Sequence, residues 1–194
     1  MGKNRKRPQF TPEEKLCPAL LAESSDRGLV LVGHSFLDYE LGQMLKRFFE
    51  SRLCGDSAGT LDKGDEERVD RLLFGSPPDT EAIAGSYSVR VTLLQVLGLI
   101  DRETCSALRA LNGLRILCAH SPTVFSLTNA RVGEMVAKLP QESQQRVIEN
   151  RVFERATIKP ASWGPAQVDM YGVILALFTK LIKVQLTHRI HSFQ

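Results

Sequence analysis

The sequence predicts an all-α fold, a single bundle of five to seven helices. Over long stretches, apolar residues recur at steps of three and four, which is the spacing of one buried helix face. No two alternating apolar segments are joined by a short turn, as a β-hairpin would require. The chain has 194 residues, of which 43% are hydrophobic and 24% charged. It is therefore long enough for one core and too short for two ordinary domains.

The first 22 residues are predicted to form a basic, proline-containing tail, because three prolines interrupt any long helix there. Its positive charge comes from a cluster near the start of the chain: Lys3, Arg5, Lys6 and Arg7. Without these four, the chain holds 21 basic and 22 acidic residues. The rest of the chain is thus nearly neutral and lacks the excess positive charge that is typical of nucleic-acid-binding proteins. A solvated tail is the preferred interpretation, and weak contact with phosphates is the alternative.

Residues 23–194 are predicted to form the helical domain, with Ser24, Ser25 and Asp26 offering cap oxygens at its start. We expect helices over 24–53, 66–74, 86–100, 101–120, 130–138, 141–155 and 167–191. The segment 86–100 is apolar on most sides, which favours a helix buried in the middle of the bundle. Its three valines would also suit a strand, and that alternative stays open.

Cysteine use and the distribution of apolar residues favour a soluble, cytoplasmic protein. The four cysteines form no C-x-x-C pair, and no secretory signal or membrane span is recognisable in the sequence. His188 and His191 lie three residues apart, but they lack acidic or cysteine companions, so we predict no metal site. No cofactor is expected.

The segment Gly33-His34-Ser35-Phe36 resembles part of a serine-hydrolase elbow, but the second glycine of G-x-S-x-G is missing. We therefore reject a hydrolase. In a helix, His34 and Asp38 are four residues apart and lie on one face, where they could hydrogen-bond to each other. This pair is interpreted as a core or surface contact, and support of a functional site on a neighbouring helix is the alternative.

The most specific feature of the sequence is an arginine and a histidine, Arg115 and His120, with four residues between them. Leu108, Leu111, Arg115 and Cys118 follow helical steps of three and four, so we expect Arg115 to lie along the buried stripe. A buried arginine needs a carboxylate, a carbonyl or a partner chain. Five residues turn a helix by about 500°, so the two side chains converge only if the helix ends or bends near them.

Several segments resemble the mannitol operon repressor family, whose pattern reads S-x-R-G-x-A-L-V, L-D-x-x-L, A-L-G-L-I and I-R-x-I-R-N-x-F-A-H. The matching stretches lie between residues 24 and 127: Ser24–Gly28, Leu37-Asp38, Leu41, Leu72–Phe74, Leu97–Ile100 and Ala119-His120. Within the last motif this sequence departs from the pattern. Asn112 stands in place of an arginine, Ile116 in place of an asparagine, and Cys118 in place of a phenylalanine.

This resemblance implies an all-helical, dimeric, non-enzymatic regulator of transcription that acts through protein contacts or weak DNA binding. No helix-turn-helix with a basic recognition helix is apparent. The Arg-x4-His spacing also resembles the signature of HEPN-type helical domains, many of which are ribonucleases or toxins. In that alternative, Arg115 would stabilise charge on a phosphate and His120 would move a proton. Asp26, Arg27, His34 and Asp38 are the candidate supporting residues. A non-catalytic interaction module is the third alternative.

Overall fold

The all-α prediction is confirmed by a computed structural model, which describes residues 25–53, 62–75, 84–120, 125–136 and 164–191. Within these residues every regular element is a helix. The helices are α2 (Asp26–Leu53), α3 (Lys63–Phe74), α4 (Tyr87–Val96), α5 (Arg102–His120), α6 (Ala130–Val136) and α9 (Pro165–His191). The basic cluster Lys3–Arg7 and the helix predicted over 141–155 lie outside the described residues. In the part described, no helix combines the length and the apolar character needed to cross a bilayer.

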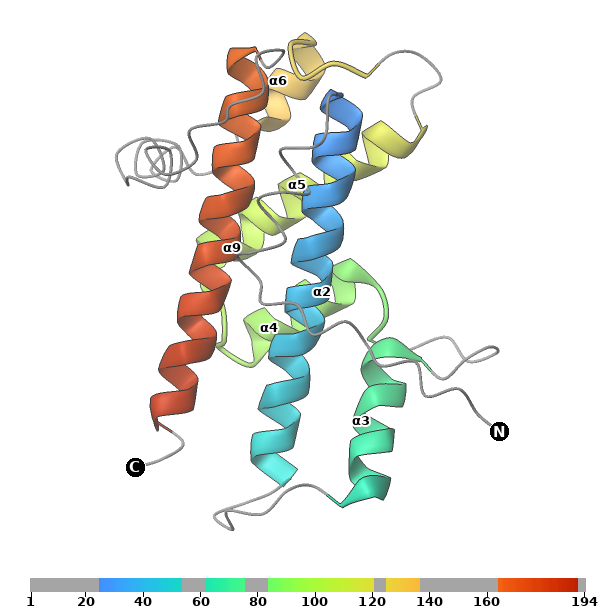
Figure 1. The fold of residues 1–194 in the computed structure, drawn as a ribbon, viewed down its shortest axis with the longest axis vertical. Coiled ribbons are helices and arrows are strands. Elements are labelled where there is room, and N and C mark those ends of the chain that lie inside the picture. Colours follow the sequence, from blue (N-terminus) through green and yellow to red (C-terminus); the bar gives the residue numbers. More distant parts are fainter. Residues whose placement is uncertain (1–24, 54–61, 76–83, 121–124, 137–163, 192–194) are drawn as a thin grey trace.

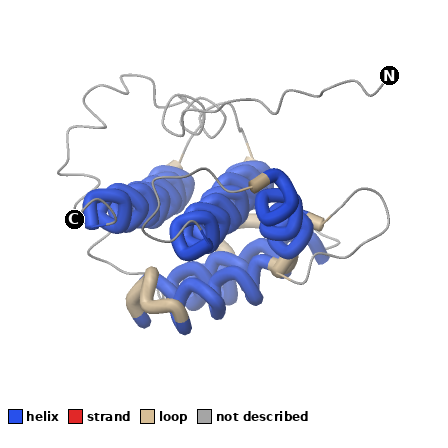
Figure 2. Tube along the Cα trace, turned by 90° about the horizontal axis from the view of Figure 1, so that it is seen from below, coloured by secondary structure: helices blue, strands red, loops and turns tan. Residues whose placement is uncertain are grey.

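Helix α2 is the centre of the fold (Figure 1). It lies between α9 and α3 in one layer, and the hairpin of α4 and α5 crosses one side of that layer (Figure 2). Leu29, Leu37, Leu41 and Leu45 of α2 are fully buried, and their spacing of four or eight residues keeps them on one side of the helix. Side chains from both layers therefore enclose one continuous core around α2.

The three helices of the first layer pack closely because glycine faces a large side chain at two points of α2. A Cβ atom at Gly33 would overlap Ile174 of α9. At Gly42, a Cβ would come within 2.7 Å of the Phe74 ring of α3. Both are distances that real Cβ atoms essentially never show, so these glycines set how near α9 and α3 approach α2.

Helix ends follow capping chemistry that is visible in the sequence. The Ser25 hydroxyl accepts a hydrogen bond from the Gly28 N–H at 3.0 Å, as expected for the start of α2. The Ser86 hydroxyl accepts from Val89 N–H at 3.3 Å. Asp101 caps α5 by accepting from the Thr104 N–H at 2.7 Å.

The segment 86–100 differs from its prediction in two ways. It is not one long helix, because Gly98, at φ 70°, lets the backbone turn back and satisfy the last carbonyls of α4. Nor is it buried in the middle of the bundle, since Val89 and Val96 are exposed. Only the side of α4 that faces α2 enters the core, and the strand alternative is wrong.

Candidate functional site

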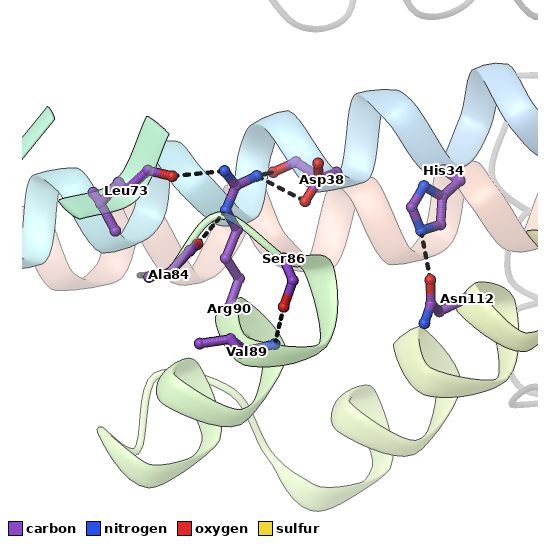
Figure 3. A network of polar contacts seen from close by, with 8 residues as sticks. All are labelled: His34, Asp38, Leu73, Ala84, Ser86, Val89, Arg90 and Asn112. Atoms are coloured by element: carbon purple, nitrogen blue, oxygen red, sulfur yellow. Dashed lines mark hydrogen bonds and ion pairs between the residues drawn. The ribbon is translucent and has the colours of Figure 1, made fainter. Parts of the chain in front are cut away.

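A cluster of polar side chains lies where α2 crosses the α4–α5 hairpin (Figure 3). Asp38 lies on the side of α2 that meets α4, and Arg90 lies near the middle of the otherwise apolar α4. Arg90 is 6% exposed, so its charge is almost fully removed from water. A buried charge of this kind must be paired and hydrogen-bonded to be tolerated.

Arg90 meets that requirement with four hydrogen bonds. Its Nη1 donates to the Asp38 carboxylate at 2.7 Å and to the Asp38 carbonyl at 3.1 Å. Its Nε donates to the Ala84 carbonyl at 3.0 Å, and its Nη2 donates to the Leu73 carbonyl at 2.8 Å. The guanidinium also lies 5.5 Å from the ring centre of Phe74. Arg90 thus joins α2, the end of α3 and the segment before α4, with its donors directed inward.

His34, one turn before Asp38, belongs to a second set of contacts (Figure 3). Its Nε2 lies 3.1 Å from Asn112 Oδ1 of α5, and its ring stacks on Tyr87 of α4 at 4.2 Å between centroids. Asn112 Nδ2 in turn donates to the Ser88 hydroxyl at 3.4 Å. The expected His34–Asp38 hydrogen bond is therefore wrong, because His34 pairs with Asn112 of α5 whereas the Asp38 carboxylate pairs with Arg90 of α4.

Burial lowers the pKa of His34 below its usual 6.5, and the positive charge of Arg115 adds to that effect. The hydrogen bond with Asn112 and the charge of Asp38 act in the opposite direction without outweighing burial. His34 is consequently neutral at pH 7, and its Nε2–H can donate to the Asn112 carbonyl oxygen. This histidine serves as a neutral link between helices.

Arg115 does not lie on the buried stripe of α5, which corrects the expectation from the sequence. Leu111, Leu114 and Cys118 are buried, whereas Arg115 and His120 are exposed. The stripe drifts around a helix of 3.6 residues per turn, and Arg115 falls at its edge. Because α5 is one continuous helix to His120, Arg115 and His120 stay roughly 140° apart around its axis.

The other supporting candidates lie at the start of α2. The Asp26 carboxylate accepts a hydrogen bond from the Leu127 N–H at 2.7 Å, which ties the segment before α6 to α2. Arg27 and Asp26 both lie near the buried Cys118 of α5. Burial raises the pKa of that thiol to about 11, with Asp26 adding to the rise and Arg27 opposing it. The thiol is therefore protonated and unreactive at neutral pH.

The predicted residues thus separate into two groups. His34 and Asp38 lie in two neighbouring sets of inter-helix contacts where α2 crosses the hairpin, while Arg115 and His120 are exposed on different sides of α5. The sequence interpretation missed Arg90. The signal was available, because Arg90 is the only charged residue between Tyr87 and Val96, and a lone charge in an apolar helix must find partners.

No family model matches the chain, and no curated protein is similar in sequence. Two solved structures have a similar fold. MtlR in the X-ray structure of the MtlR–HPr complex from Escherichia coli has a TM-score of 0.59 and 18% identity, covering 91% of this chain and 99% of that chain. A possible transcriptional regulator, YggD from Shigella flexneri 2a str. 2457T, has a TM-score of 0.60 and 15% identity, covering 92% and 99%. The chain therefore has an MtlR-like fold, as the resemblance implied.

Proposed function

We propose that this chain is a non-enzymatic regulator of transcription that acts by binding another protein. The observation that carries the proposal is the correspondence of nearly the whole chain to two solved structures, one described as a possible transcriptional regulator and one solved in complex with HPr. Because the similarity covers nearly the whole of both chains, it concerns the entire fold and not a single helical hairpin of a kind found in many folds.

The arrangement of charged side chains supports binding over catalysis. Asp38, His34 and Arg90 are engaged with neighbouring helices, so none of them presents a free group to a substrate. Arg115 and His120 are exposed on different sides of α5, without a described partner that would orient them toward one reacting atom. The cytoplasmic location expected from the use of cysteine and the homodimer implied by the resemblance both form part of this proposal.

Direct titration with a defined protein tests the proposal. Purified Escherichia coli HPr, added to the full chain in a calorimeter, is expected to bind at one site per chain with a Kd in the micromolar range. Bovine serum albumin at the same concentration serves as the non-specific control. A transcriptome of a strain that lacks the gene is expected to change in a small set of transcripts, restored by the wild-type gene. No HPr binding together with an unchanged transcriptome would refute the proposal.

A further inference from the structure

One surface of the α4–α5 hairpin does not take part in the packing of the core. On the side turned away from the core, this hairpin carries three exposed aliphatic and two exposed basic side chains. We call this set the hairpin outer face: Val89, Val96, Arg102, Arg109 and Ile116. The exposed fractions of its aliphatic members are 38% for Val89, 77% for Val96 and 44% for Ile116. It holds three of the five exposed large hydrophobic residues in the part of the chain described.

Helical spacing places these residues in two adjacent rows. Val89 and Val96 are seven residues apart on α4, and steps of seven on α5 connect Arg102, Arg109 and Ile116. Seven residues turn a helix by about 700°, so each row stays within roughly 20° per step on one side. The α5 row is about 21 Å long at 1.5 Å per residue.

Hydrogen bonds across the hairpin show that the two rows adjoin. Arg109 Nη2 lies 3.4 Å from the Thr92 hydroxyl and 3.4 Å from Gln95 Oε1, so the Arg109 side chain reaches across to α4. The Cys105 thiol donates to Gln95 Oε1 at 2.9 Å just beneath it. Aliphatic and basic groups therefore share one continuous surface.

The charge of the hairpin outer face is entirely positive. Among the described residues, Arg102 has no carboxylate partner, and Arg109 contacts only the neutral Thr92 and Gln95. The nearby Asp101 is engaged by Lys180 of α9 at 2.9 Å. Glu103 follows Arg102 directly and so lies about 100° away around α5.

We propose that the hairpin outer face binds a protein surface on which carboxylates flank aliphatic or aromatic anchors. Burial of Val96 and Ile116 against such anchors removes apolar area from water, and each arginine can form a bidentate pair with a carboxylate. Arginine beside apolar groups is the composition that protein interfaces favour. The inference rests on the proposed function, in which the chain acts through a protein partner.

Charge disfavours the other occupants of this face. A second copy of the chain, docked through the same surface, would bring arginines against arginines. Residues 1–24 and 137–163 of this chain each contain five basic and three acidic residues, so neither segment supplies the complementary charge. Nucleic acid would pair with the arginines but would leave the aliphatic row without apolar partners.

Two synthetic peptides provide the probe. Both are amphipathic helices of about 18 residues with the same leucine stripe, flanked by glutamates in one and by lysines in the other. Fluorescence anisotropy with the full chain is expected to show binding of the glutamate peptide, weakened by added salt, and no binding of the lysine peptide. Equal affinity for both peptides, or none for either, would overturn the proposal.

Variants locate the binding. The double variant Arg102→Glu with Arg109→Glu is expected to lower the affinity for the glutamate peptide about tenfold or more, because attraction between opposite charges becomes repulsion between like charges. The matched control reverses two exposed basic residues of α3, Lys63→Glu with Arg71→Glu, and is expected to leave affinity within about twofold. Val96→Ser, at a largely exposed position, is expected to weaken binding about threefold without changing the fold.

Three further results would contradict binding at the hairpin outer face. They are unchanged affinity in the Arg102/Arg109 variant, an equal loss in the α3 control, and displacement of the peptide by a duplex DNA of about 20 base pairs at lower concentration than by unlabelled peptide. Thermal melting followed by circular dichroism checks that each variant is folded. The peptide result and the HPr titration are independent, so HPr can fail to bind while this surface is confirmed, and the reverse.

Discussion

At the crossing of α2 and α4, Arg90 is buried and donates four hydrogen bonds to Asp38, Ala84 and Leu73. On the opposite side of the same hairpin, Arg102 and Arg109 are exposed and have no carboxylate partner among the described residues. One residue type thus has two roles within one pair of helices. Position around the helix axis decides between them, because a guanidinium facing the core must satisfy its donors internally, whereas one facing water is available for a partner.

Removal of the Asp38 carboxylate should have the largest effect on folding. Asp38→Ala leaves the buried Arg90 charge without its counter-ion, and we expect a loss of about 3–5 kcal/mol in the free energy of unfolding. Urea denaturation followed by circular dichroism measures it. Lys180→Ala, which breaks the exposed Asp101–Lys180 pair, is the control and should cost less than about 1 kcal/mol. Equal effects in the two variants would show that burial does not distinguish these ion pairs.

Gly42→Ala tests the space beside Arg90. The new methyl group would lie 2.7 Å from the Phe74 ring and 3.5 Å from Arg90 Cζ, so Phe74 must move. We expect a net loss of about 1–2 kcal/mol, since crowding outweighs the roughly 1 kcal/mol gained by alanine over glycine in a helix. Gly133→Ala on α6, where a Cβ atom would meet open space, is the control and should be neutral or stabilising. Stabilisation by Gly42→Ala would contradict the close approach of α2 and α3.

His34 should make stability depend on pH. Its folded pKa lies below the unfolded value of 6.5, so protons bind more readily to the unfolded chain as the pH falls below that value. Stability is fully present above pH 6.5 and declines as the pH drops toward the folded pKa. Urea midpoints at pH 7.5 and pH 5.5 should therefore differ more for the wild-type chain than for His34→Gln. An identical pH dependence of both proteins would mean that His34 is not the group responsible.

The smallest effects are expected at the exposed end of α5. Arg115→Ala and His120→Ala should change the free energy of unfolding by less than about 0.5 kcal/mol, since both side chains are exposed. As the chain is proposed to be non-enzymatic, overexpression of the wild-type protein and of His120→Ala should slow growth equally or not at all. Toxicity that disappears in His120→Ala would instead favour the ribonuclease alternative.

The arrangement of helices was accessible from sequence because its signals are local. Caps at Ser25 and Asp101 and the leucine stripes of α2 and α5 fix where the helices lie and which side is buried. Gly98 is also a local signal for the end of a helix, but the apolar run through residues 97–100 favoured continuing the predicted helix past it.

Contacts between helices were not accessible in the same way. Two of the partners of Arg90, Leu73 and Asp38, are 17 and 52 residues away in the chain, and no spacing rule connects residues that far apart. The His34–Asp38 pair was inferred from α2 alone, whereas the partners of both side chains depend on how α2, α4 and α5 cross. The buried Arg115 was wrong for another reason, because the buried stripe drifts around α5 and leaves Arg115 at its exposed edge.

We propose that the buried arginine holds the fold and that the exposed arginines recognise a partner. Titration of the ¹⁵N-labelled chain with the glutamate peptide, followed by amide chemical shifts, distinguishes these two roles. We predict shifts at Val89, Val96, Arg102, Arg109 and Ile116, with the amides of Asp38 and Arg90 unchanged. Shifts centred on the crossing of α2 and α4, or on α3, would show that the peptide does not bind the hairpin outer face.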